Sequence, residues 1–278
     1  MIVQNHKTAS PAIALEPLQA DSIRDFLTNQ GTSTQYRIDV LPTVTSTNDY
    51  LAELGLAGTG CVAVCIADQQ TQGKGRFGHS WWSPAGVNLY LSMQWGLQQW
   101  RTRYEVLGLW LLIAIAQLLE QLGTTGVRLK WPNDICVGGK KLGGILIERR
   151  GAVEQHSLII GVGLNVAMSQ ADEFQETPGW VDLLSVHPDW RQCRNELAAH
   201  VIEVLNCVLG TLDDSDPEDL CSAWDRYDSL SNQRVKFLYQ DRHMYGEVKG
   251  IDAQGCIVMR VNGEDLHLHS AHVRELRL

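Results

Sequence analysis

The chain has 278 residues, of which 44% are hydrophobic and 20% charged, a composition typical of a globular protein. Its formal net charge of −9, from 23 basic and 32 acidic side chains, disfavours broad contact with nucleic acid, because such contact needs clustered cations. The length fits one large domain, or a large domain with a small one.

Seven cysteines are scattered along the chain without a CxxC pair, which disfavours a zinc site or a disulfide framework. Most of them stand in or beside apolar runs, so we expect mainly buried thiols. The sequence begins MIVQNHKTAS, without the charged start and apolar stretch of a secretory signal. These features predict a cytoplasmic protein, because free thiols persist in reducing compartments.

The first 35 residues are expected to form a partly disordered extension with one helix over Leu18–Thr28. Tyr36–Pro42 has the pattern of a strand. Ser46 or Thr47 is then placed to cap a helix that runs through Leu54.

The middle of the chain alternates between apolar runs and turns. Cys61–Ala67 and Val87–Trp95 predict strands, the first from a β-branched run and the second from its alternating pattern. The apolar stretch Val106–Leu119 is shorter than the roughly 20 residues that span a bilayer, so we expect a buried helix over 105–122. Further strands are predicted around a Pro-Asn-Asp turn and after it, at Val127–Trp131, Ile135–Val137, Gly143–Arg149 and Ser157–Val166.

The last hundred residues change character. A polar loop is expected over 168–190, and Gln192–Leu209 predicts an amphipathic helix. Asp216 and Pro217 open another helix, as a cap followed by proline in the first turn. From Asn232 onward short strands are separated by turns, which is typical of a small all-β module.

Residues 73–78 (GKGRFG) form a glycine-rich basic loop. Its letters match the GxGxxG of dinucleotide-binding folds, but that motif must open a helix, and Pro84 with the alternating pattern after it disfavours one. A Walker A loop would need Lys and then Ser or Thr where this loop continues with His79. The glycines still allow close ligand approach, and Lys74 and Arg76 suit phosphate or carboxylate. A solvated surface turn is the alternative interpretation.

Several segments, in order, resemble biotin–protein ligases. They are Ser46–Asn48 (STN), Gln70–Trp81, Ser83–Ser92, Lys130–Asp134 (KWPND), Lys141–Leu146 (KLGGIL) and Gly161–Asn165 (GVGLN). Each segment alone is weak, but the ordered set is specific and covers about residues 36–278. The resemblance implies an α+β fold, with a mixed β-sheet catalytic domain and packed helices over 36–231, then a small C-terminal β-barrel domain over 232–278.

The resemblance also implies a two-step reaction. The carboxylate of biotin attacks the α-phosphate of ATP to form biotinyl-5′-AMP, and a lysine of a biotin carboxyl carrier protein then takes the biotin. Because two anions meet in the first step, nearby cations and Mg²⁺ are expected to stabilise the charge. A mobile glycine-rich loop would shield the hydrolysable intermediate from water.

Roles for individual residues follow from the same resemblance. The catalytic set implied is Lys141, Arg76 and Asp134. The biotin-binding set is Ser46, Thr47, Asn48, Gln70, Lys74, Gly75, Arg76, Lys141 and Gly144. The ATP-binding set is Arg76, His79, Trp81, Lys130, Asn133, Asp134 and Asn165. No metal ligand is assigned. Structural alternatives stand beside these roles, namely a plain helix cap at Ser46 and Thr47, a surface position for Lys141 and a core position for Trp81.

The glycine loop departs from the family pattern. That pattern usually reads GRGRxGR, and here Lys74 and His79 replace the first and third arginines while Arg76 is retained. Lysine keeps the charge but loses the planar fork, and histidine is charged only part of the time near neutral pH.

Three other functions are kept as alternatives, namely a lipoate–protein ligase, a biotin-binding module without turnover, and a DNA-binding repressor. The KWPND segment and the GKGRFG loop favour biotin over lipoate. A helix-turn-helix needs a second helix to enter the DNA groove, whereas residues 1–35 predict one helix. We therefore expect a form without that domain and without a DNA partner. No membrane partner is expected, and a homodimer through an exposed sheet edge stays open.

Overall fold

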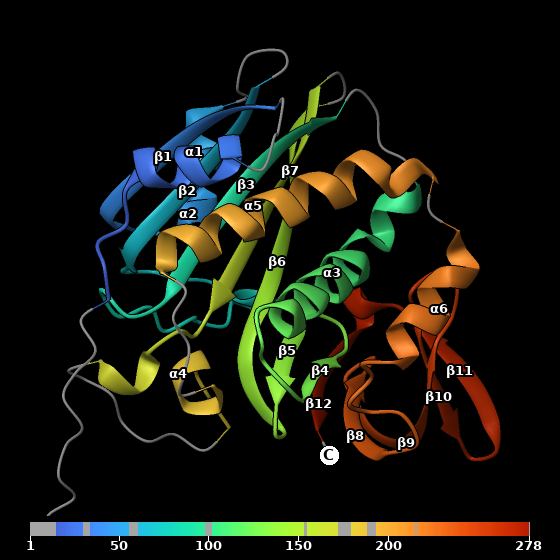
Figure 1. Ribbon diagram of the computed structural model, residues 1–278. Helices are drawn as coiled ribbons and strands as arrows, with labels where there is room; N and C mark the ends of the chain where they lie inside the picture. Colours follow the sequence, from blue (N-terminus) through green and yellow to red (C-terminus); the bar gives the residue numbers. More distant parts are fainter. Residues whose placement is uncertain are drawn as a thin grey trace, which may run out of the picture.

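The computed structural model describes residues 15–29, 34–55, 61–97, 102–152, 155–171, 179–187, 193–214 and 216–277. These residues form a seven-stranded sheet with packed helices and a five-stranded sheet that follows it in the chain (Figure 1). The strands of the first sheet are β1 (Gln35–Val44), β2 (Cys61–Gln70), β3 (Leu89–Leu97), β4 (Val127–Lys130), β5 (Asp134–Val137), β6 (Lys140–Ala152) and β7 (Gln155–Leu164).

The seven-stranded sheet has the order β1-β2-β3-β7-β6-β5-β4. Only β1 and β2 pair in parallel among the described strands, and the other pairs are antiparallel. The sheet is therefore mixed, as the resemblance predicted. Its centre is the long pair β6–β7, in which Gly144 lies opposite Gly163 and Leu146 opposite Gly161.

Helices cover both faces of this sheet. On one face lie α1 (Ala20–Asn29), α3 (Leu107–Gln121) and α5 (Arg194–Thr211), which cross in front of the strands in Figure 1. On the other face lies α2 (Thr47–Leu54), whose Leu51 packs in a separate cluster with Ala63, Cys65 and Ile159. Successive side chains of a strand point to opposite faces, so alternate residues of β2 and β7 pack against the helices on the two faces of the sheet.

The expected buried helix over 105–122 is α3, with nine buried residues between Leu107 and Leu119. It is apolar on most of its circumference because the sheet and α5 enclose it. None of the helices in the described ranges combines the length and apolar character needed to cross a bilayer.

The C-terminal sheet has the order β11-β10-β9-β8-β12 and is antiparallel throughout. Its strands are β8 (Arg234–Tyr239), β9 (Arg242–Ile251), β10 (Ile257–Val261), β11 (Glu264–Leu268) and β12 (Val273–Arg277). This sheet confirms the small β module that the sequence predicted. Strands β11 and β12 form its two edges. The helix α6 (Pro217–Asp225), capped by Asp216 as predicted, joins the two parts.

The two sheets meet through the KWPND segment. The Trp131 indole N–H donates to the Gly255 carbonyl at 3.1 Å. Gly255 adopts φ +77°, and a Cβ there would fall 2.9 Å from a Leu109 methyl, so the turn packs directly on α3. This contact fixes the C-terminal sheet beside the turn between β4 and β5.

Three expectations from the sequence need correction or lie outside the structure. The polar stretch 168–190 is not all loop, because it holds the short helix α4 (Leu183–Val186), capped by Asp182. Of the seven cysteines, two are buried, four are intermediate and Cys207 is exposed, so the prediction of mainly buried thiols is wrong. Residues 1–14 of the expected disordered extension lie outside the described residues, whereas its predicted helix is α1.

Candidate functional site

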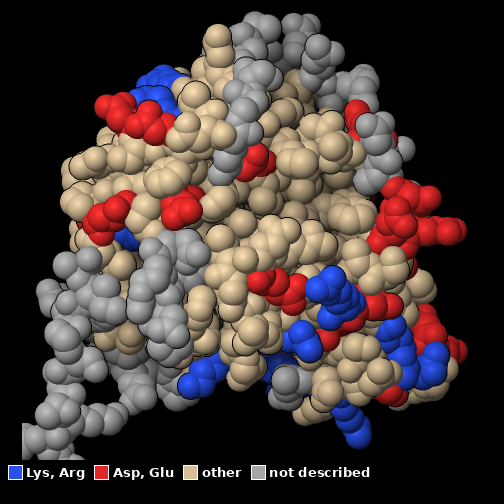
Figure 2. All heavy atoms as spheres, in the orientation of Figure 1, with Lys and Arg blue, Asp and Glu red and all other residues tan. Residues whose placement is uncertain are grey.

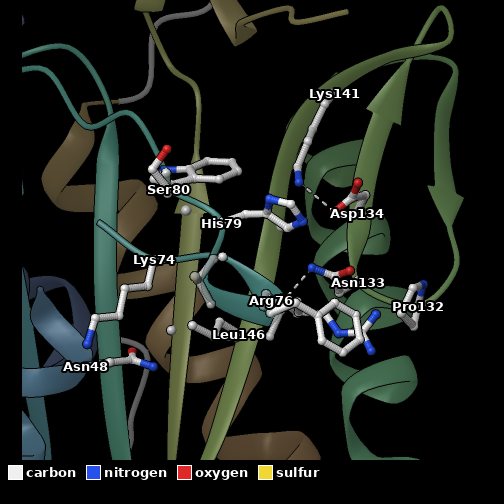
Figure 3. Close-up of a pocket in the computed structure, with 18 of the residues that line it drawn as sticks. Asn48, Lys74, Arg76, His79, Ser80, Pro132, Asn133, Asp134, Lys141 and Leu146 are labelled. Carbon is white, nitrogen blue, oxygen red and sulfur yellow. Dashed lines mark hydrogen bonds and ion pairs between the residues drawn. The ribbon is translucent and has the colours of Figure 1, made fainter. Parts of the chain in front are cut away.

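A cavity of about 330 Å³ opens on the α2 face of the large sheet. Its walls come from α2, the glycine loop, β5–β7 and β12. Every residue that the sequence analysis placed in the site lines this cavity, except Asn165. Figure 3 shows Lys141, Asp134 and Asn133 on one side and Lys74 and Asn48 on the other.

Glycines make the floor of the cavity. A Cβ on Gly163 would lie 2.9 Å from the Trp81 ring, and one on Gly161 would lie 2.5 Å from the Asn48 Oδ1. In the neighbouring strand, a Cβ on Gly144 would lie 3.0 Å from the Asn133 carbonyl oxygen. Because these glycines face the same side of paired strands, they let Trp81, Asn48 and the Asn133 backbone approach the sheet closely around the cavity.

The end of the cavity next to α2 is neutral and polar. Ser46 caps α2, and the Ser92 hydroxyl lies 2.6 Å from both Thr47 Oγ1 and Asn48 Oδ1. The Gln70 side-chain oxygen accepts from the Thr47 backbone N–H at 2.9 Å. All of these groups except Gln70 are at least nine-tenths buried, so their geometry is held firmly by the sheet below. Ser46 therefore caps α2, and both Ser46 and Thr47 also line the cavity.

Asn48 is also fixed from the side by a carboxylate. Its amide nitrogen donates to Glu148 Oε2 at 2.8 Å. Glu148 lies on β6, two residues beyond Leu146, and so faces α2. Glu148 and Ser92 were not predicted as site residues, because nothing in their local pattern points to a residue more than 40 positions away.

The glycine loop is a narrow hairpin between β2 and β3. The Gly75 N–H donates to the His79 carbonyl at 2.7 Å, and the Trp81 N–H donates to the Gly73 carbonyl at 2.8 Å. A Cβ on Gly73 would lie 2.4 Å from the Trp81 carbonyl oxygen, so only glycine fits there. The loop itself holds a single 3₁₀ turn, Arg76–Gly78, and the next element along the chain is the strand β3. This agrees with the rejection of a dinucleotide-binding motif.

Arg76 turns from the loop toward the C-terminal sheet. Its guanidinium donates to the Ser270 carbonyl at 2.6 Å and lies 4.7 Å from the centre of the Phe77 ring. Arg274 of β12 lies 4.9 Å from the same ring. Burial lowers the pKa of Arg76, and the nearby Asp134 carboxylate opposes that shift. Phe77 and Arg274 were not predicted as site residues, since only the fold brings residue 274 to the loop.

The opposite end of the cavity carries charge. The Lys141 ammonium lies 2.7 Å from Asp134 Oδ1 and 5.0 Å from the centre of the Trp81 ring. Asp134 and Asn133 come from the turn between β4 and β5, where the Trp131–Pro132 peptide is cis. Figure 3 shows the exposed His79 ring directed toward the Lys141–Asp134 pair. A ligand here would meet Arg76 of the glycine loop, Lys130 of β4 and Lys141 of β6.

Two predicted residues have other partners in the structure. Lys74 lines the cavity, but its ammonium lies 2.5 Å from Asp49 Oδ2 on α2. Asn165 is 1% exposed and does not line the cavity; its amide donates to the carbonyls of Lys141 and Val181. Asn165 therefore supports the Lys141 backbone, and its position does not favour the predicted contact with phosphate.

Comparisons with known proteins agree with this geometry. Residues 40–165 match the model of the biotin/lipoate A/B protein ligase family. The bifunctional ligase/repressor BirA of Escherichia coli is 36% identical over 252 residues, which cover 89% of this chain and 76% of that protein. The biotin–[acetyl-CoA-carboxylase] ligase of Mycobacterium tuberculosis is 30% identical over 268 residues, or 94% of this chain and 97% of that protein.

The fold has solved counterparts as well. The biotin protein ligase of Aquifex aeolicus, in complex with biotin and ATP, superposes with a TM-score of 0.71. The match covers 87% of this chain and 98% of that one, at 23% identity, which bears on the fold alone. The sequence identity to the two bacterial enzymes, which extends over most of this chain, shows that it belongs to the biotin/lipoate A/B protein ligase family, as a biotin–protein ligase.

Proposed function

We propose that this chain activates biotin with ATP as biotinyl-5′-AMP and transfers the biotin to a lysine of a biotin carboxyl carrier protein. The observation that carries the proposal is the division of one cavity into a neutral polar end and a charged end, with a glycine floor between them. An acid with a neutral head and a carboxylate tail fits that division, and the glycine loop stands where the two ends meet.

The polar end suits the ureido ring of biotin. That ring offers two N–H donors and one carbonyl acceptor, and it needs short polar side chains within a largely apolar wall. Ser46, Thr47, Asn48 and Gln70 supply hydroxyl and amide groups at this end. The hydrogen bonds from Thr47 to Gln70 and from Ser92 to Thr47 and Asn48 fix these side chains before a ligand arrives, which reduces the entropy lost on binding.

The charged end suits the activation step. The biotin carboxylate attacks the α-phosphate of ATP, the phosphorus–oxygen bond to the β-phosphate breaks, and pyrophosphate leaves. Lys141 and Arg76 lower the repulsion between the two anions and hold them in line, with Gly75 and Gly144 allowing close approach. Lys130, Asn133, His79 and Trp81 complete the proposed nucleotide side of the cavity.

Magnesium is the expected cofactor of this step, and the residues fit a metal that ATP brings with it. The described residues hold no cluster of three or more His, Cys, Asp and Glu side chains suited to a metal. Mg²⁺ is commonly held by one or two carboxylates together with substrate phosphates and water. Asp134 is the carboxylate in this cavity that would supply such a ligand, and the bound ion would neutralise phosphate charge.

In the transfer step, the amine of the carrier lysine attacks the acyl carbon of the adenylate, and AMP leaves with the bonding electron pair. A free lysine has a pKa of about 10.4, so its amine must lose a proton to attack. Asp134 is partly exposed at the cavity, which supports a role in orienting the incoming ammonium and accepting that proton. The carrier class is supported by the name of the mycobacterial relative.

The other proposed properties rest on charge and fold. Several similar bacterial proteins are named as repressors as well as ligases. On the face shown in Figure 2, basic side chains are interspersed with acidic ones, and the net charge is −9. We therefore propose ligation without DNA binding, which a gel shift with biotin and ATP present would test. The free cysteines support a cytoplasmic location. A homodimer through an exposed sheet edge stays a prediction, for sedimentation analysis to check.

The decisive experiment is acid-dependent exchange of labelled pyrophosphate into ATP, with biotin or lipoate supplied in parallel. We expect exchange with biotin alone. Exchange with lipoate alone would assign the chain to lipoate ligation. Tight biotin binding without exchange would identify a binding module that has lost activation.

A further inference from the structure

Lys74 faces away from the charged end of the cavity. In Figure 3 its side chain runs from the glycine loop toward α2, on the opposite side from Lys141 and Asp134. Its ammonium lies 2.5 Å from Asp49 Oδ2, with 42% of the Lys74 side chain and 23% of the Asp49 side chain exposed. The sequence suggested a cation for the ligand, whereas the structure pairs this cation with a carboxylate of the protein.

Asp49 belongs to a capped helix and Lys74 to a hydrogen-bonded hairpin. Asp49 lies in the first turn of α2, which Ser46 caps and which the fully buried Leu51 anchors to the sheet. Lys74 lies opposite Ser80 at the base of the hairpin loop, next to the bond from the Gly75 N–H to the His79 carbonyl. A restraint on Lys74 therefore restrains the whole hairpin.

A second set of charges continues from Asp49 toward the polar end of the cavity. Arg150 lies 3.9 Å from Asp49 Oδ1 and 2.9 Å from Glu148 Oε1. Glu148 in turn accepts the hydrogen bond from the Asn48 amide. Arg150, Glu148 and Leu146 alternate along β6 on the face toward α2, so the strand itself spaces these contacts. The loop and the polar end are thus joined by contiguous ionic and hydrogen-bonded contacts.

We propose that Asp49 is a positioning residue that anchors the glycine loop over the cavity through Lys74, so that this ion pair sets how long the activated adenylate stays bound. The identity of the retained ligand rests on the proposed function, whereas the anchoring of the loop does not. Partly exposed ion pairs of this kind contribute modestly, which corresponds to about a two- to fivefold change in a rate or an equilibrium. The contribution falls as added salt screens the charges.

The test compares Asp49→Asn, Lys74→Met and the doubly substituted chain with the wild type, each as the full chain. The control is Glu53→Gln, which removes one charge from the exposed side of the same helix. Two quantities are measured, namely the dissociation rate of biotinyl-5′-AMP formed in place from biotin and ATP, and the hydrogen exchange of amides 73–81 without ligand. The first depends on the reaction, and the second reports the loop alone.

We expect each single substitution to raise the dissociation rate about two- to fivefold and to speed loop exchange, with no further increase in the double variant. The difference in dissociation rate between the wild type and the single variants should shrink as ionic strength rises. Glu53→Gln should have the dissociation rate and the loop exchange of the wild type. A Lys74→Met effect with no Asp49→Asn effect would overturn the proposal in favour of a direct ligand contact. If the wild type forms no adenylate, the proposed function fails instead, and unchanged loop exchange in both variants would then overturn the anchor.

Discussion

Lys141 and Asp134 form their ion pair across the space left by Gly144. The β5–β6 register places Asp134 opposite Gly144, and a Cβ on Gly144 would lie 3.5 Å from both Asp134 Oδ1 and Lys141 Cε. Regular pairing would place Lys141 opposite Val137. A register shift between Ile135 and Cys136 places it opposite Cys136 instead, one residue nearer to Asp134. The ion pair thus depends on this register shift and on glycine at position 144, as well as on the two charges.

Removal of the Lys141 charge should disable activation. We expect Lys141→Ala to slow biotin-dependent ATP–pyrophosphate exchange about 10²- to 10³-fold, because a preorganised cation at the reacting oxygens is lost. The matched control is Lys140→Ala, since Lys140 precedes it on β6 and is exposed. Equal exchange rates for Lys141→Ala and wild type would refute the catalytic assignment.

Asp134 should matter most in the transfer step. Asp134→Asn keeps the shape of the side chain but removes the base, so we expect transfer from preformed biotinyl-5′-AMP to the carrier to fall about 10²-fold or more. Raising the pH should partly restore that rate, because more of the carrier lysine is then uncharged. Single-turnover transfer across a pH series measures both effects. A variant with wild-type rates in both half-reactions would remove Asp134 from the mechanism.

The glycine floor should tolerate no added methyl group beside Asn48. In Gly161→Ala the new Cβ would fall 2.5 Å from Asn48 Oδ1, which Ser92 already holds. We expect the KM for biotin to rise about 10- to 100-fold, because small displacements in a preorganised site are costly. Gly210→Ala in α5 is the control, since a Cβ there meets nothing within 4 Å. That change should leave KM unaltered and raise Tm, as alanine stabilises a helix by about 0.5–1 kcal/mol over glycine.

Stability should depend on pH through Asp228. Burial raises the pKa of this carboxyl above its ordinary value, although the Leu230 N–H, which donates to it, opposes the shift. A carboxyl whose pKa is raised by folding favours the folded state while protonated, and that contribution is lost as pH rises through the raised pKa. Asp228→Asn should therefore have a higher Tm than wild type at pH 7, with the gap narrowing in acid. A gap that widened on acidification would contradict the assignment.

The sequence predicted strands and helices well where apolar residues form long continuous runs, as in β2 and α3. The short helix α4 escaped prediction because its stretch is dominated by polar residues, and four helical residues give no periodicity. The motifs located the cavity, but they did not give the partners within it. Lys74 pairs with Asp49, and Asn48 with Glu148, across 25 and 100 positions. Such pairs follow from strand order, which local patterns do not encode.

The bond from Arg76 to the Ser270 carbonyl spans 194 positions of the chain. Closing a contact between residues so distant in sequence costs more chain entropy than closing a local one. The wall that β12 adds to the cavity therefore depends on both sheets being folded and docked together. Without that docking, Arg76 would lose the carbonyl that holds it. The cavity is thus a property of the whole chain and not of either sheet alone.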